Sequence, residues 1–190
     1  MSSTDFYDIK IDTDINTDIG NNAQKVKFYF ESVGTQKVIK AIEYSYLDYY
    51  FLDKPVYNLG FGNYNPITEE ICDIGVSNNG DVYKVFNTVL HTVSIFFNHI
   101  PNGLLFVQGS DSSPDYLENC ILTCHKNCID KCKKVDRRIS IYQGFIDKNY
   151  SLLFDKYVFM GGVAAVNGKT RVENYVVGKR YNAVLVYKII

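Results

Sequence analysis

The residues with the clearest chemical potential form a short polar turn between two apolar segments. The turn consists of Asn78, Asn79, Gly80 and Asp81. An apolar run precedes it at 71–77 and an amphipathic run follows at 82–100, so the pattern predicts a strand that passes through the turn into a helix. Free backbone amides and the helix dipole attract phosphate at such a junction, which makes the turn a candidate cofactor-binding site.

The acidic end of this turn favours a structural role instead. Asp81 places a carboxylate at the start of the predicted helix, where it would cap the backbone amides and repel a phosphate. Gly80 would then allow a tight turn rather than the close approach of a ligand. We therefore interpret 78–81 as a structural turn, keep cofactor binding as the alternative, and predict no cofactor.

Four cysteines at intervals of four residues form the second chemical constellation. They are Cys120, Cys124, Cys128 and Cys132. On a straight helix this spacing places them on one stripe, with about 18 Å between the first and the last, which is too far for all four to bind one ion. Leu117 and Ile121 lie beside the same stripe, so packing in the core is the interpretation we prefer. Metal binding and redox sensing are the alternatives.

The composition limits the class of protein. The chain has 190 residues, 46% of them hydrophobic, which suits one domain with one core. A formal net charge of -1 gives no overall field for nucleic acid or a membrane surface, and we expect neither as a partner. The sequence shows no membrane helix, no signal peptide and no disulfide framework typical of secretion, so we expect a cytoplasmic protein with free cysteines.

The first half of the chain predicts a β-meander followed by a helix. Residues 1–24 are rich in Asp, Asn, Thr and Ser and predict a flexible or loosely docked leader before a single domain at 25–190. Alternating apolar residues and turn residues then predict four antiparallel strands. These lie at 25–32, 38–46, 55–62 and 71–77. The amphipathic run predicts a helix at about 81–99, and the apolar run at 104–107 predicts a buried strand.

The second half predicts one more helix and closing strands. A cluster of capping residues at 111–114 marks the start of the helix, and the basic run Lys131 to Arg138 marks its end. The remaining apolar runs predict strands at 139–146, 152–158 and 181–190. The expected fold class is therefore α+β, with a mostly antiparallel mixed sheet and two main helices.

Several segments carry a resemblance to a known family. They read SNNGDVYKVFNTV, LLFVQGSDSSPDYLENCI, ISIYQGFI and YNAVLVYK. Over most of residues 25–190 the chain is similar to an uncharacterised bacterial family, a domain of unknown function with members of about this length. The resemblance implies the domain boundaries and no particular activity.

The order of the predicted elements also resembles the acetyl-CoA-dependent N-acyltransferase superfamily. The resemblance implies an acyltransferase-like fold in which the amides from Gly80 to Val82 would bind the pyrophosphate of acetyl-CoA. The superfamily's turn carries Gln or Arg followed by two small residues, and here only Gly80 matches, because Val82 replaces the second small residue. Tyr142 or Tyr116 would then be the general acid.

The residue types favour contact over catalysis. No pair of side chains has the spacing of an acid/base set, and the sixteen Tyr residues are of a type enriched at contact surfaces. Those we expect to contribute, on predicted strands, are Tyr44, Tyr46, Tyr49 and Tyr50. We predict a non-catalytic module that binds a protein partner or forms a homo-oligomer. An acetyl-CoA- or nucleotide-dependent transferase and a cysteine-based metal or redox protein are the alternatives.

Overall fold

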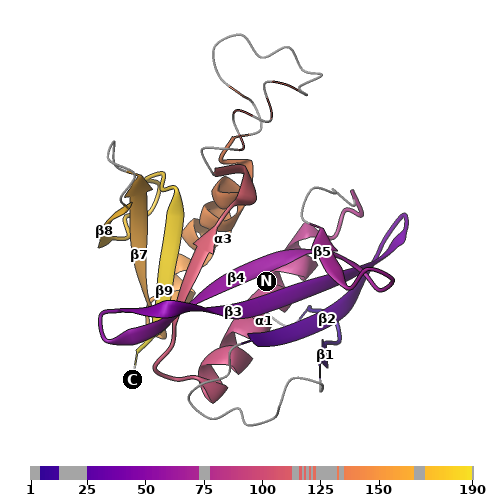
Figure 1. Ribbon diagram of the computed structural model, residues 1–190, viewed down its shortest axis with the longest axis horizontal. Helices are drawn as coiled ribbons and strands as arrows, with labels where there is room; N and C mark the ends of the chain where they lie inside the picture. Colours follow the sequence, from indigo (N-terminus) through magenta and orange to yellow (C-terminus); the bar gives the residue numbers. More distant parts are fainter. Residues whose placement is uncertain are drawn as a thin grey trace. The chain divides into compact units, whose positions relative to one another are not determined.

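The computed structural model describes five continuous ranges of the chain and five single residues. The ranges are 5–12, 25–72, 78–112, 135–164 and 170–189, and the single residues are Tyr116, Glu118, Cys120, Leu122 and Cys132. Contacts divide the chain into two compact units, residues 1–105 with residue 190 (unit 1) and residues 106–189 (unit 2). The described residues form helices and antiparallel strands, which confirms the predicted α+β class (Figure 1).

Unit 1 contains an antiparallel sheet in the order β1-β2-β3-β4, with β5 paired to β4. Its strands are β1 (Lys10–Ile11), β2 (Lys25–Val33), β3 (Lys37–Phe51), β4 (Lys54–Asn65) and β5 (Glu70–Cys72). In the first hairpin Val33 pairs with Lys37, and in the second Phe51 pairs with Lys54. These hairpins confirm the meander that alternation predicts, while residues 73–77 of the last predicted strand lie outside the described residues.

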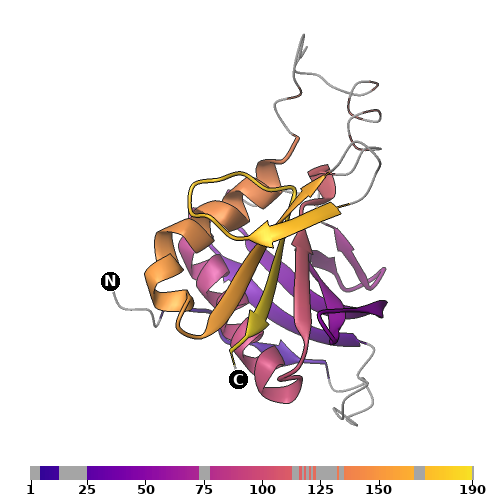
Figure 2. The same ribbon diagram turned by 90° about the vertical axis from the view of Figure 1, so that its left-hand side faces the viewer.

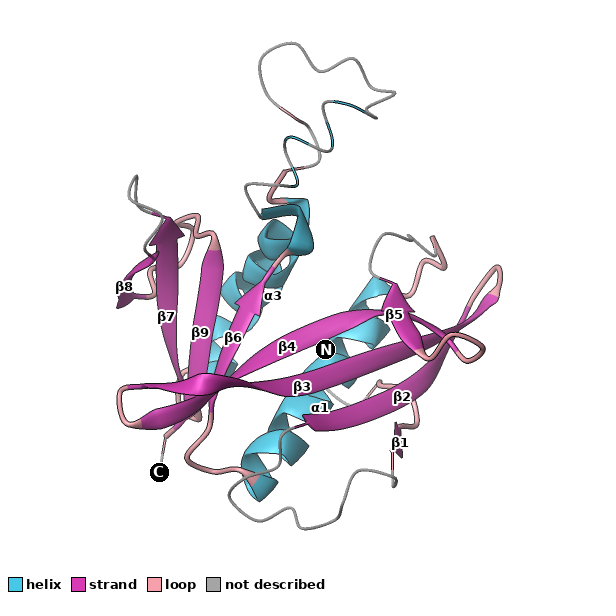
Figure 3. Cartoon of the chain, viewed as in Figure 1, coloured by secondary structure: helices cyan, strands magenta, loops and turns pink. Residues whose placement is uncertain are grey.

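Helix α1 (Val82–His99) packs on one face of this sheet, behind the strands in Figure 3. The side chains of β2 alternate between buried and accessible, because successive residues of a strand point to opposite faces. The Tyr44 ring of β3 stacks on Phe96 of α1 with 4.6 Å between ring centroids, and its hydroxyl hydrogen-bonds Thr92 Oγ1 at 2.8 Å. The predicted helix is confirmed, although Val82, which the pattern placed in the apolar stripe, is exposed.

Unit 2 combines a small sheet with helix α3 (Arg137–Leu153). Its strands are β6 (Leu104–Gln108), β7 (Tyr157–Ala164), β8 (Thr170–Asn174) and β9 (Ala183–Lys188). Their order in the sheet is β6-β9-β7-β8, and the first two residues of β6 belong to unit 1. Helix α3 lies against these strands (Figure 2). The fully buried Gln143 joins helix and sheet segment, because its amide donates to the Tyr181 carbonyl at 2.6 Å and accepts from the Tyr181 amide at 3.4 Å.

Three predictions for the second half are wrong. The strand predicted at 152–158 is instead the end of α3 at Leu153, a turn and the start of β7 at Tyr157. Residues 139–146, predicted as a strand, belong to α3, and the basic run predicted to end a helix at Arg138 instead leads into the start of one. The pattern misled because the buried side of α3 includes the polar Gln143, while the apolar Ile141 is exposed. The predicted capping residue Asp111 does cap a helix, but it reaches α3, where its carboxylate accepts from the Arg138 amide at 3.0 Å.

Candidate functional site

The polar turn before α1 is tied to the β2–β3 hairpin by Asn79. The Asn79 amide nitrogen donates to Ser32 Oγ at 2.9 Å and to the Gln36 carbonyl at 3.0 Å. Its amide oxygen accepts from Thr35 Oγ1 and from the Gln36 amide. Gly34 permits this contact, since a Cβ there would lie 2.5 Å from the Asn79 carbonyl oxygen. The polar atoms of the Asn79 side chain are therefore occupied within the protein.

The Asp81 carboxylate does not cap α1, so that prediction is wrong. One carboxylate oxygen accepts from Ser32 Oγ at 2.6 Å and from the Tyr7 hydroxyl at 2.8 Å, and the side chain makes no bond to the helix amides. Only the Asp81 backbone carbonyl joins the helix, by accepting from the Val85 amide. Ser32 is fully buried, so the carboxylate satisfies a hydroxyl that would otherwise lack an acceptor. The predicted cofactor turn thus serves contacts within unit 1.

A small cavity of about 440 Å³ opens beside the same turn. It is lined by Asp5, Tyr7, Val33, Gly80, Asp81, Tyr83 and Lys84. Lys84 is held by Asp5, with 2.9 Å between Nζ and the carboxylate, and this hydrogen bond raises the pKa of the Lys84 ammonium. Two carboxylates against one ammonium make the cavity a poor environment for phosphate. Gly80 and Asn78 both have positive φ, of 74° and 50°, which suits a tight turn.

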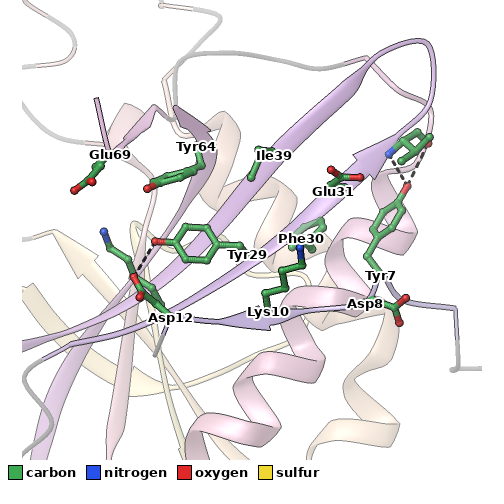
Figure 4. A pocket seen from close by; sticks show the side chains of 12 residues that line it. Tyr7, Asp8, Lys10, Asp12, Tyr29, Phe30, Glu31, Ile39, Tyr64 and Glu69 are labelled. Atoms are coloured by element: carbon green, nitrogen blue, oxygen red, sulfur yellow. Dashed lines mark hydrogen bonds between the residues drawn. The ribbon is translucent and has the colours of Figure 1, made fainter. Parts of the chain in front are cut away.

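A cleft of about 800 Å³ lies on the sheet face opposite α1 (Figure 4). Its lining comprises Tyr7, Asp8, Lys10, Asp12, Lys27, Tyr29, Phe30, Glu31, Val33, Ile39, Tyr64 and Glu69. In the register of the sheet Tyr29 pairs with Ala41, which in turn pairs with Gly62. These small residues leave room between Tyr29 and Tyr64, whose rings lie 4.7 Å apart at 59° to each other. Two neighbouring aromatic rings therefore stand among charged and apolar side chains in the lining.

The charges of the cleft are mostly acidic. Four carboxylates, from Asp8, Asp12, Glu31 and Glu69, face the two ammonium groups of Lys10 and Lys27. The Lys27 ammonium is paired with Glu43 at 3.3 Å, and the Glu31 carboxylate with Lys37 at 3.2 Å. Such an excess of carboxylates favours a cationic ligand over an anionic one.

Tyr29 keeps its hydroxyl proton in this setting. Burial raises the pKa of the Tyr29 phenol, and its neighbours Tyr64 and Asp12 raise it further. The neutral hydroxyl donates to the Asp12 carboxylate at 3.1 Å and holds that carboxylate at the mouth of the cleft. The Tyr29 ring and the Asp12 carboxylate thus form a fixed pair.

Sequence reasoning missed the cleft because its residues are scattered. Asp8, Lys10 and Asp12 lie in the segment predicted as a leader, while Tyr29 and Tyr64 lie on strands that the sheet brings together. The signal that was available is the charged and aromatic alternation Lys27, Tyr29, Glu31 on the accessible side of β2.

A buried lysine lies on the opposite face. Lys40 of β3 is only 7% exposed and donates to the Asn63 side chain at 2.8 Å. Burial lowers the pKa of the Lys40 ammonium, an effect that the Asp81 carboxylate partly offsets. Lys40 is not among the lining residues of the two cavities described above.

The tyrosines predicted for contact divide into two groups. Tyr44 is fully buried in the core, so its predicted role in a contact surface is wrong. Tyr46 is half-buried, and only Tyr49 and Tyr50, near the tip of the β3–β4 hairpin, are exposed.

The separation predicted for the first and last cysteines on a straight helix is wrong, although both side chains are buried. Cys120 and Cys132 are both buried, and their sulfur atoms lie 3.3 Å apart, whereas a straight helix would separate the two residues by about 18 Å. The predictions for Cys124 and Cys128 lie outside the described residues. Of the residues that the structure does describe, no three His, Cys, Asp or Glu side chains gather into a group that could hold a metal ion.

Comparison with known proteins gives one match. The model of a family of unknown function (DUF6934) matches residues 16–189. The chain belongs to this family. The DUF6934 match spans the turn, most of the cleft and the cysteine segment, and it confirms the resemblance to an uncharacterised family. No curated protein and no solved structure matches the chain, so the acyltransferase-like topology stays a prediction. In the part of the chain that the structure describes, none of the helices is both long and apolar enough to cross a lipid bilayer.

Proposed function

We propose that this DUF6934 protein is a non-catalytic protein-binding module whose cleft holds a basic segment of a partner. The observation that carries the proposal is the group of four carboxylates around the Tyr29–Tyr64 ring pair. Guanidinium and ammonium groups bind both to carboxylates and to the faces of aromatic rings. A lining that offers both suits an Arg or Lys side chain in an extended peptide.

The volume of the cleft agrees with a ligand of this kind. A space of about 800 Å³ lies within the range of sites that bind small molecules and can hold a few side chains. The pairing of β1 with β2 places Asp8, Lys10 and Asp12 along one rim of the cleft. Tyr64 of β4 and Glu69 of the β4–β5 turn contribute to the other rim. A partner segment would therefore meet carboxylates on both sides.

Binding of short model peptides to the full chain tests the proposal. We expect a labelled tetra-arginine peptide to bind in fluorescence anisotropy at low salt, and a tetra-glutamate peptide not to bind. Asp12→Asn combined with Glu69→Gln should weaken arginine-peptide binding about tenfold, since each lost charge contact contributes about 0.7 kcal/mol at a surface. Tyr64→Ala should weaken it as well, through loss of the cation–π contact.

A carboxylate outside the cleft provides the matched control. Glu173→Gln removes an acid that pairs with Arg171 and Lys179 in unit 2, and it should leave the affinity unchanged. Equal weakening by Glu173→Gln would mean that only the net charge matters. Preference for the glutamate peptide, or no binding of either peptide, would contradict the proposal.

Self-association through the β3–β4 hairpin is a second candidate function. Beyond the last β2–β3 pair, Lys25 with Ser45, β3 continues to Phe51, so one edge of residues 46–51 has no strand partner among the described residues. Such an edge can pair with the same edge of a second copy. The tip also exposes apolar side chains, with Tyr50 63% and Leu52 54% exposed.

Leu52 is the residue that supports this candidate most directly. Leu52 and Asp53 connect the strands with positive φ angles of 53° and 57°, a conformation for which Asn and Gly are favoured. A leucine there costs backbone energy and exposes apolar surface, which a contact with another molecule would offset.

Replacing Leu52 separates folding from association. We expect Leu52→Asn to leave stability equal or slightly higher and to shift a dimer toward monomer in sedimentation experiments over micromolar concentrations. Ile67→Asn, at an exposed apolar residue in another turn, is the matched control and should not change the mass. A wild-type chain that stays monomeric throughout the range would contradict self-association.

The transferase alternative has less support. The side chains of Asn79 and Asp81 are committed to contacts within unit 1, and two carboxylates line the cavity beside the turn. Thermal stabilisation by acetyl-CoA that disappears in Gly80→Val would revive this alternative, because ligand binding to the native state raises its stability.

A further inference from the structure

Two buried thiols touch each other in unit 2. Cys120 is 8% and Cys132 9% exposed, and the 3.3 Å between their sulfur atoms is a direct contact between thiols. A disulfide requires about 2.05 Å between the sulfurs, so closure needs an approach of about 1.2 Å. Thiols this close are positioned to react with each other.

The position of the two residues in the sequence makes the contact informative. They are 12 residues apart in the sequence, and their sulfur atoms are nevertheless in contact. Burial raises the pKa of the Tyr116 phenol, and the nearby groups of Cys120, Asp111 and Cys132 raise it further. The pair therefore belongs to the environment around the start of α3, where Asp111 contacts the Arg138 amide.

The two thiols in contact are the groups that a disulfide requires. A protein zinc site uses at least three side-chain ligands, and among the described side chains no such group is found.

We propose that Cys120 and Cys132 are a redox-active dithiol that closes reversibly into an intrachain disulfide. The oxidant is a low-molecular-weight disulfide of the glutathione type. One cysteine thiolate attacks it, forming a mixed disulfide and releasing one small thiol. The other thiolate then attacks the protein sulfur of the mixed disulfide and releases the second small thiol. Two electrons pass to the oxidant, and each cysteine gives up one proton.

The contact predicts which step is fast. Burial slows the first attack, because the small disulfide must reach a sulfur that is less than one-tenth exposed. The second attack is intramolecular between groups already in contact, so the mixed disulfide should not accumulate. The structure thus predicts an intrachain product and little mixed disulfide at these two residues.

Peptide mapping of the full wild-type chain tests the proposal. The protein is equilibrated in mixtures of reduced and oxidised glutathione, quenched with acid, alkylated and digested with trypsin. Cleavage after Lys126 and Lys131 places Cys132 on a different peptide from Cys120, so a disulfide between them joins two peptides. Cys124 shares the peptide of Cys120, and fragmentation of the joined peptides in the mass spectrometer distinguishes the two. We expect this linkage in at least about tenfold excess over any other, given the advantage of thiols already in contact.

Two controls accompany the measurement. Cys72, which is exposed on β5, should form a mixed disulfide with glutathione and report that the oxidant is active. In Cys120→Ser, Cys132 has lost its described partner and should accumulate as the mixed disulfide. The wild-type linkage decides the question even if this variant does not fold.

Three outcomes would overturn the proposal. The first is a disulfide from Cys120 or Cys132 to Cys124 or Cys128. The second is that Cys120 and Cys132 remain alkylatable thiols when Cys72 is oxidised. The third is stoichiometric zinc in the purified protein that must be removed with a chelator before these thiols react, which would assign the pair to metal binding instead.

Discussion

The two faces of the sheet in unit 1 are built from the same strands and differ in how their polar groups are used. On the face that meets α1, polar side chains pair within the protein, as Tyr44 does with Thr92 and Ser32 with Asp81. On the opposite face, the cleft presents carboxylates from the residues flanking β1, from β2 and from the β4–β5 turn. Alternation along each strand separates these two roles residue by residue.

This difference teaches where binding is to be expected. A polar group satisfied inside the fold contributes to stability and has nothing left to offer a ligand. The turn at 78–81 belongs to this class because Asn79 and Asp81 join α1 to the β2–β3 hairpin. The open face presents carboxylates beside aromatic rings, and we therefore place the partner there. Substitutions on the two faces should have opposite profiles, with loss of stability on one and loss of binding on the other.

The largest effect should come from Phe96→Ala on the closed face. Phe96 is almost fully buried and its ring contacts those of Tyr44, Tyr57 and Phe97. Removing it should lower the free energy of unfolding by about 3–5 kcal/mol, the range for a buried aromatic replaced by alanine. Urea denaturation followed by circular dichroism measures the change.

Tyr50→Ala is the matched control for Phe96→Ala, since it removes an aromatic ring that is mostly exposed. It should change stability by no more than about 0.5 kcal/mol. Similar losses for the two variants would break the comparison between a closed and an open region.

The next largest effect should come from the polar network at the start of α1. Asp81→Ala removes the acceptor of the buried Ser32 hydroxyl and of the Tyr7 hydroxyl, which should cost about 2 kcal/mol. Adding Ser32→Ala should recover part of that loss, because the unsatisfied hydroxyl is then gone. A double-mutant cycle in urea measures the coupling. Strictly additive losses would show that the two side chains do not interact.

The sequence predicts α1 well because its buried side is mostly apolar. Val85, Val89 and Phe96 recur at helical spacing and are buried as expected. Thr88 and Thr92 are buried as well, but a search for apolar residues leaves them out because they carry hydroxyl groups. The same effect is stronger in α3, where the fully buried Gln143 interrupts the periodicity.

The candidate sites depend on contacts that local patterns do not contain. The cleft needs the register that sets Tyr29 opposite Ala41 and Gly62, and strand register is set by the whole sheet. The role of Asp81 reversed because Ser32, 49 residues earlier, supplies a donor. The residue types mark the cleft residues and Asp81 as polar positions of interest. Only the tertiary structure shows which of these side chains have a partner within the chain.

A third experiment sharpens the comparison through pH. The pKa of the buried Lys40 ammonium is lowered by desolvation, so the unfolded chain binds its proton more tightly than the folded chain does. Stability attributable to Lys40 therefore rises with pH between the folded pKa and the unfolded value of about 10.5. Lys40→Met removes this contribution, so the stability difference between wild type and variant should change across that window. Tyrosines titrate in both proteins and cancel in the difference. A difference that is constant with pH would contradict a buried charge.

The smallest effect should come from Glu43 on the open face, which pairs with Lys25 at 3.0 Å and Lys27 at 3.3 Å. Burial raises the pKa of the Glu43 carboxyl, but hydrogen bonds from Lys25, Ser45 and Lys27 outweigh this and lower it. The stabilisation is therefore complete above the unfolded pKa and is lost as pH falls through the folded pKa. Glu43→Gln should cost about 0.5–1 kcal/mol near about pH 7, and urea denaturation should show no difference at about pH 2. Because Glu43 neutralises Lys27 beside the cleft, the same variant should also weaken binding of a cationic peptide. A loss of stability without loss of binding would confine Glu43 to the fold.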